Sequence, residues 1–162
     1  MEPPKFGDCY TAGEIAQKIY KVSTETLMAH SIRAVEGYLR QHYDFDTAIV
    51  LQPSKEVLSD MGRMSWCSVA SNTGDPSYIF YQDDHPNWEK SHKRFCIAHE
   101  LYHVIWAVGS SIKTPRRDRT AESVCDIFAN ELCRCHDTFY AEQATKQNAD
   151  LRFQGLPFKS VT

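Results

Sequence analysis

Residues 96–106 read CIAHELYHVIW and place two histidines and a glutamate inside an apolar run. If this run is a helix, His99 and His103 are four positions apart, so their side chains share one face and can reach the same ion. Glu100 is turned about 100° away from His99, where it can hold a water molecule and accept its proton. The spacing therefore predicts a catalytic zinc site. The competing interpretation is a buried helix whose histidines bond to backbone or water.

A catalytic zinc needs three protein ligands, so a third must come from elsewhere in the chain. One extended form of the motif requires Gly at 106 and His at 109, but the sequence has Trp106 and Gly109. A glutamate on a following helix is the alternative, and Glu122 lies 19 residues after His103, beyond a loop that can reverse the chain. Asp126 follows one helical turn later, where its carboxylate can accept the free N–H of a ligand histidine.

These two segments, RFCIAHELYHVIW and AESVCDIFANELC, resemble the signature of the ImmA/IrrE family of zinc metallopeptidases. The resemblance covers about residues 47–135. It implies a gluzincin-like fold, ligands at His99, His103 and Glu122, Glu100 as the base, and cleavage of a helix-turn-helix repressor that controls a stress, mobile-element or phage-defence operon. The sequence departs from the family pattern at Cys125, where alanine is usual, at Tyr102, where glycine is usual, and in the ELCRC ending. We expect none of these departures to touch a ligand. The matching positions are Arg94, Phe95, Ala98, His99, Glu100, His103, Glu122, Asp126, Phe128, Ala129 and Leu132.

Hydrophobic periodicity predicts an α+β fold with N-terminal helices, a small three-stranded, mainly antiparallel sheet, the HExxH helix and a second ligand helix. Residues 12–41 have helical spacing, with a second helix capped at Ser23 or Thr24. Strands are expected at 47–54, 63–71 and 77–82. The long helix should run from Pro86 or Trp88 to Val108. A loop over 109–120 should follow, with Thr120 capping a helix to about residue 135.

Length and composition favour a single intracellular domain. The 162 residues suffice for one core, which we divide into an N-terminal helical segment (1–45), a catalytic core (46–136) and a tail (137–162). A net charge of −3 argues against a nucleic-acid binder as a whole. No apolar run approaches a membrane span, and the first residues lack a signal-peptide core, so we expect a cytoplasmic protein without membrane contact. Its six cysteines should then be thiols or metal ligands.

Several weaker signals lie near the predicted site. Cys96 shares a helical face with His99 and could cap the zinc as a thiolate, although burial as an apolar residue is the simpler interpretation. Cys133, Cys135 and His136 could hold a second ion with Cys9 or His92, or could simply end a packed helix. Tyr78, Tyr81, Tyr102, His85 and His92 are candidate donors to the substrate carbonyl oxygen.

The loop between the two ligand helices is basic, with Lys113, Arg116, Arg117 and Arg119. It is either a solvated loop or a nucleic-acid contact, and we expect single-stranded DNA bound there to raise a low basal activity. Residues 14–30 faintly resemble a helix-turn-helix, but the would-be recognition helix has few basic residues, so packing is favoured over DNA reading. The leading hypothesis is a cytosolic zinc endopeptidase. A non-proteolytic zinc-containing DNA-binding or sensor protein and a secreted effector protease are the alternatives.

Overall fold

The computed structural model describes residues 5–22, 27–82 and 90–135. The elements in chain order are α1 (Cys9–Val22), α2 (Leu27–Tyr43), β1 (Ile49–Pro53), α3 (Lys55–Asp60), β2 (Ser65–Ser68), β3 (Ser77–Tyr81) and α4 (Lys90–Gly109). Residues 119–135 are also helical. This order confirms the predicted α+β class. The short helix α3 was not predicted. The proposed caps at Ser23 and Thr24, the helix start near Pro86 or Trp88, and the tail lie outside the described residues.

The sheet is mixed rather than mainly antiparallel, which corrects the expectation. Its strand order is β1-β3-β2, with β3 in the centre. β2 pairs antiparallel with β3, whereas β1 pairs parallel with β3, from Ile49 opposite Ser77 to Pro53 opposite Tyr81. The chain leaves β1 through α3 and returns as β2, so β3 runs in the direction of β1. β1 and β2 are therefore the two edges of the sheet.

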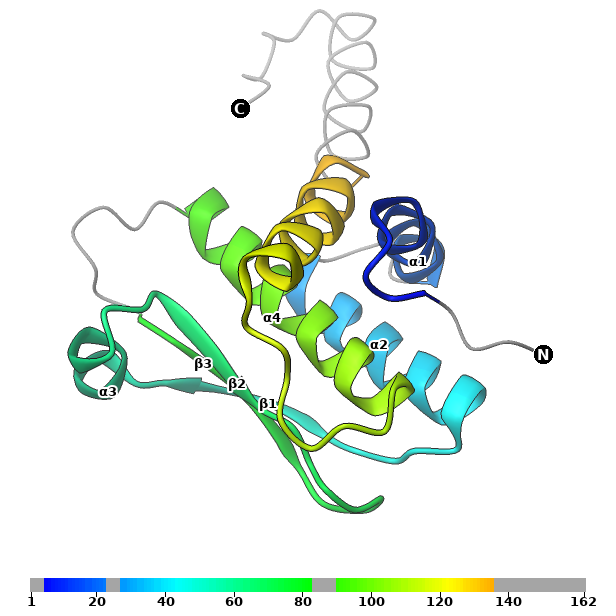
Figure 1. The fold of residues 1–162 in the computed structure, drawn as a ribbon, viewed down its shortest axis with the longest axis horizontal. Helices are drawn as coiled ribbons and strands as arrows, with labels where there is room; N and C mark the ends of the chain where they lie inside the picture. The colour runs from blue at the N-terminus through cyan, green and yellow to red at the C-terminus, as the bar shows by residue number, and fades with distance from the viewer. Residues whose placement is uncertain (1–4, 23–26, 83–89, 136–162) are drawn as a thin grey trace, which may run out of the picture.

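One face of the sheet is covered by α4, and α2 lies against α4 (Figure 1). Alternate side chains of the strands point into this layer, as a pleated strand requires, and Ile49, Cys67 and Ile79 are all buried. The helix over 119–135 lies against α4, where the Phe128 ring stacks on Tyr102 at 4.9 Å. α1 contacts α2, and its Gln17 side chain reaches Glu131. Helices and sheet therefore share a single hydrophobic core.

Helix α4 forms the centre of this core. From Cys96 to Ala107 every residue is buried, so the apolar side chains of the helix are enclosed on all sides. A helix that is apolar all round is expected only in such a central position. No helix in the described part of the chain combines the length and apolar character of a membrane span.

The C-terminal end of α4 contacts the N-terminal segment closely. A Cβ atom built on Gly109 would overlap the Phe6 ring, so the glycine permits this close approach. The Tyr102 hydroxyl donates a hydrogen bond to the Phe6 carbonyl oxygen at 2.8 Å. Both contacts fix the segment before α1 against the helix that carries the HExxH motif.

The helix over 119–135 begins at Asp118, not at Thr120 as predicted. The Asp118 carboxylate accepts a hydrogen bond from the Ala121 amide at 2.8 Å, and its carbonyl accepts one from the Glu122 amide at 3.0 Å. An aspartate three positions before its amide partner is a strong N-cap. Thr120 is already within the helix. The cap fixes the first turn, which carries Glu122.

Candidate metal centre

Two buried imidazoles face each other on α4. The Nε2 atoms of His99 and His103 lie 3.1 Å apart, and their ring centroids are separated by 4.9 Å. His99 is 8% exposed and His103 is 1% exposed, because both rings point from the central helix toward the helix over 119–135. The predicted convergence of the two rings is therefore present.

Glu122 lies across these two rings. Its Oε2 is 3.1 Å from His99 Nε2, and its Oε1 is 3.0 Å from His103 Nε2. Burial raises the pKa of the Glu122 carboxyl, but the hydrogen bonds to His103 and His99 outweigh it and leave the pKa well below its ordinary value. The carboxylate is thus ionised and placed against both imidazoles, as the proposed third ligand should be.

Asp126 contacts the far side of His99. Its Oδ1 is 2.7 Å from His99 Nδ1, which orients the ring and leaves Nε2 directed at Glu122. By contrast, His103 Nδ1 is buried without a hydrogen-bond partner among the described residues. Burial lowers the pKa of both rings. Hydrogen bonding to Glu122 and nearby negative charge reverse the shift at His99, whose pKa is raised, but not at His103, whose pKa is lowered.

Glu100 is 1% exposed and does not join the histidines directly. Its Oε2 is 4.0 Å from His99 Nε2 and accepts a hydrogen bond from the Ser65 hydroxyl at 2.9 Å. A cavity of about 200 Å³ reaches His99, Glu100 and Glu122 and is bounded on the sheet side by residues 63–65, of which Ser65 begins β2. The carboxylate is therefore close to the histidine pair but on a different side of it, as predicted from its position on the helix.

Arg117 is the site residue that sequence reasoning placed incorrectly in space. It was grouped with an exposed basic loop, but its side chain is 13% exposed and points into the centre. Its Nη2 donates to Glu100 Oε1 at 2.6 Å, and its Nη1 is 3.3 Å from Glu100 Oε2 and 3.4 Å from Glu122 Oε1. The guanidinium also stacks on the Trp66 ring, with its carbon 3.9 Å from the centroid. Only the doublet Arg116-Arg117 in the sequence hinted at such a role, without showing which arginine turns inward.

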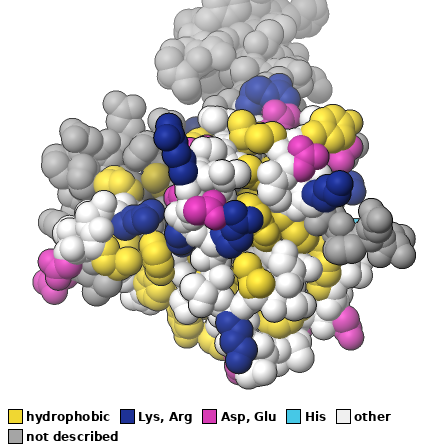
Figure 2. Space-filling model, viewed as in Figure 1, with side chains coloured by type: hydrophobic (Ala, Val, Ile, Leu, Met, Phe, Trp, Pro, Cys, Tyr) yellow, Lys and Arg dark blue, Asp and Glu magenta, His cyan; other side chains and the backbone are white. Residues whose placement is uncertain are grey.

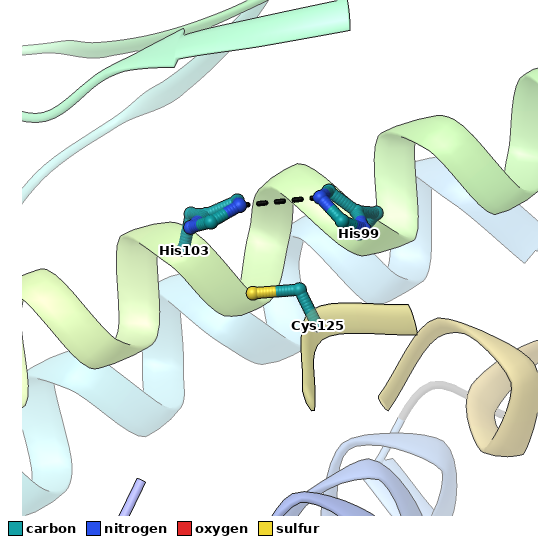
Figure 3. A group of neighbouring side chains, drawn as sticks. All are labelled: His99, His103 and Cys125. Carbon is teal, nitrogen blue, oxygen red and sulfur yellow. Dashed lines mark hydrogen bonds between the residues drawn. The ribbon is translucent and has the colours of Figure 1, made fainter. Parts of the chain in front are cut away.

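Cys125 joins the histidines as a third potential metal ligand. One ligand atom from each of His99, His103 and Cys125 lies within 4.8 Å of the others, and all three residues are buried (Figure 3). This group could hold a metal ion. The expectation that the Cys125 departure touches no ligand is not tested by this geometry, but position 125 is one turn after Glu122 on the same face of the helix and lies near both histidines. Burial raises the pKa of the Cys125 thiol, so it ionises only beside a strong positive charge.

The other cysteines are not members of the His99, His103 and Cys125 group. Cys96 lines the same cavity as His99 and Glu100, and burial raises the pKa of its thiol to about 11, but it is outside the His99, His103 and Cys125 group. Cys133 and Cys135 are half-buried, and Cys9 is exposed. His136 and the side chain of His92 lie outside the described residues. A second metal site there stays a prediction.

The candidate carbonyl-oxygen donors are also separated by the structure. Tyr102 is fully buried and hydrogen-bonded to Phe6, so it cannot reach a substrate. Tyr78 and Tyr81 lie on β3, where Tyr78 stacks with Phe80 and Tyr81 lies under the Lys93 ammonium. His85 and the side chain of His92 lie outside the described residues. Among the described residues, none of the three tyrosine hydroxyls forms a hydrogen bond with His99 or His103.

Three of the four basic loop residues lie at the surface. Lys113, Arg116 and Arg119 are exposed, and Arg116 pairs with Asp118 while its guanidinium lies 5.3 Å from the Trp106 ring centroid. On the face shown in Figure 2, lysines and arginines are scattered among acidic side chains. A nucleic-acid contact stays a prediction, and Arg117 is turned away from it. The side chains at the turn of the segment 14–30 lie outside the described ones.

Comparison with protein-family models, with curated proteins and with solved structures found no match. Function is therefore inferred from the residues of the site itself.

Proposed function

We propose that the protein is a zinc endopeptidase of the ImmA/IrrE type, with His99, His103 and Glu122 as metal ligands and Glu100 as the base. The observation that supports this most is the convergence of two Nε2 atoms and one carboxylate within 3.0–3.1 Å. Ligand atoms about 2.0–2.2 Å from a tetrahedral ion lie roughly 3.3–3.6 Å apart, so small rotations suffice to admit zinc. Two neutral imidazoles and one carboxylate are also a donor set that zinc favours.

A bound zinc ion would polarise the peptide carbonyl and increase the acidity of a water molecule. Glu100 then accepts the proton from that water and passes it to the leaving amine. Ser65 donates to Glu100 Oε2 and so fixes the direction of the carboxylate. Asp126 holds the His99 ring so that Nε2 stays available. Glu100 would thus move the proton, and Ser65 and Asp126 would hold Glu100 and His99 in the orientations that this step needs.

The proposed substrate is a helix-turn-helix repressor, bound as an extended segment along β2. β2 is an edge of the sheet, and its Ser65 contacts Glu100 directly. An extended peptide can add to such an edge through backbone hydrogen bonds and thereby bring one peptide bond to the site. The substrate class rests on the resemblance of the two ligand segments.

A non-proteolytic zinc sensor is the second candidate, and Cys125 favours it. His99, His103, Glu122 and Cys125 together are four protein donors, which would close the coordination of a tetrahedral ion. A closed site leaves no position for water. However, a structural ion does not need Glu100. Burial of this carboxylate costs desolvation free energy, and the chain nevertheless carries it at this position.

Replacement of Glu100 by glutamine separates the two functions. Purified wild-type and Glu100→Gln proteins, both zinc-loaded, are mixed with candidate repressors, and the products are analysed by mass spectrometry. We expect wild type to cut one repressor at a defined bond and Glu100→Gln to lose at least about 100-fold of that rate while keeping its zinc, because general-base catalysis contributes about 10²–10⁴-fold.

Metal analysis of the same samples is the control. If Glu100→Gln cleaves as fast as wild type, Glu100 is not the base. A wild-type protein that carries zinc but cleaves no candidate repressor would favour the sensor.

A further inference from the structure

We propose that Arg117 is an autoinhibitory residue that closes the site, and that segment 113–117 is the lid that carries it. This inference rests on the proposed peptidase function, because it states how that site is kept inactive. Arg117 contacts the proposed base and the proposed ligand at once, and its neighbours in the loop are exposed.

The guanidinium offers no accessible donor to a substrate. Of its five N–H groups, those on Nη1 and Nη2 point at Glu100, Glu122 and Cys67, at distances from 2.6 to 3.5 Å. Its Nε is buried and has no hydrogen-bond partner. Arg117 therefore cannot stabilise a carbonyl oxygen from this position, so the contacts are those of a closed state and not of a catalytic donor.

The position of Nη1 shows what is blocked. This atom lies 3.3 Å from Glu100 Oε2 and 3.4 Å from Glu122 Oε1, between the base and the ligand. A water molecule held between Glu100 and the proposed ligand Glu122 would occupy the same position. While Arg117 is in place, the water must compete with a charged hydrogen bond, which is stronger than a neutral one.

The strand that the proposed substrate would follow leads to the same arginine. β2 continues from Ser65, which contacts Glu100, to Trp66, the ring on which Arg117 stacks. A peptide bound along β2 would meet this guanidinium.

The lid has the attachments that a movable segment needs. Among the described residues, 113–117 form no backbone–backbone hydrogen bond outside regular elements. On one side Ile112 is bonded to the Ala107 carbonyl, and on the other Asp118 caps the next helix. The segment is therefore anchored at both ends and held between them by side chains, of which Arg117 is the most deeply inserted. Withdrawal of Arg117 would open the site without unwinding either ligand helix.

Arg117→Gln tests the proposal, and Arg116→Gln is its matched control. The control removes the same charge from the same segment, but Arg116 is exposed and contacts neither Glu100 nor Glu122. In zinc-loaded protein without nucleic acid, we expect Arg117→Gln to cleave the repressor about 10-fold faster than wild type, because the open population rises. Arg116→Gln should match wild type. Arg117→Lys keeps the charge but loses the planar guanidinium with its paired donors. Its cleavage rate should lie between those of Arg117→Gln and wild type.

A second measurement does not depend on cleavage. The rate at which a chelator removes zinc should rise in Arg117→Gln by a similar factor and stay unchanged in Arg116→Gln. Thermal unfolding shows whether each variant is folded. If Arg117→Gln is not folded, the comparison of Arg117→Lys with wild type tests the proposal instead. Faster zinc release with no cleavage by any protein would support the lid and contradict the peptidase. A folded Arg117→Gln that cleaves no faster and releases zinc no faster than wild type would overturn the proposal.

Discussion

The two halves of the metal centre are held in different ways. On α4, His99, Glu100 and His103 are at most 8% exposed and are fixed by the core around them. On the other side, the side chains of Glu122 and Asp126 are 27% and 50% exposed, and charge pairs position them. Packing tolerates little change, whereas a charge pair near solvent can adjust. Both halves should therefore be needed to bind an ion, but only the second half can adjust its position and so change how tightly the ion is held.

Removal of a ligand should give the largest effect. His99→Ala, His103→Ala and Glu122→Ala should each lose most of the bound zinc, because a catalytic ion needs three protein ligands. Cys125→Ala should keep it if Glu122 is the third ligand. Metal analysis after dialysis measures this. Zinc lost in Cys125→Ala but kept in Glu122→Ala would replace the proposed ligand set with His99, His103 and Cys125.

Replacement of Asp126, which orients the proposed ligand His99, should give an intermediate effect. Asp126→Asn keeps the size of the side chain but weakens the hydrogen bond to His99 Nδ1. We expect the zinc to be retained with about 10–100-fold lower affinity or activity. Competition with a chelator of known affinity measures the change. Equal affinity of the two proteins would mean that packing alone orients His99, as it must orient His103, whose Nδ1 has no described partner.

Loss of the helix cap should give the smallest effect. Asp118→Ala removes the acceptor of the Ala121 amide and should lower the free energy of unfolding by a small but measurable amount. Thr120→Ala, which changes the cap predicted from the sequence, should have less effect. Thermal or denaturant unfolding compares the two variants. A larger loss in Thr120→Ala would show that the helix begins later in solution.

Side-chain positions that follow from the periodicity of a single helix were predictable from the sequence. Contacts between two distant segments of the chain were less predictable. His99 and His103 converge because a helix repeats every 3.6 residues, and Asp126 lies behind His99 for the same reason once Glu122 is in place. The parallel pairing of β1 with β3 could not be predicted, since three short strands do not reveal their order in a sheet. The inward turn of Arg117 depends on Trp66 and Glu100, which are distant in the sequence. Cys125 was judged by comparison with a family pattern and not by its position one turn after Glu122.

The contact between Phe6 and Tyr102 also has a consequence for the order of folding. It joins residues 96 positions apart, and such non-local contacts slow the search for the native state. During synthesis, α1 and α2 leave the ribosome long before α4 exists to cover the apolar face of α2. These helices must therefore remain without their final partner while some sixty further residues are made, an interval in which exposed apolar surface favours aggregation. The residues that hold the metal centre complete the core late, so a nascent chain that stops before residue 90 would lack both the site and its central helix.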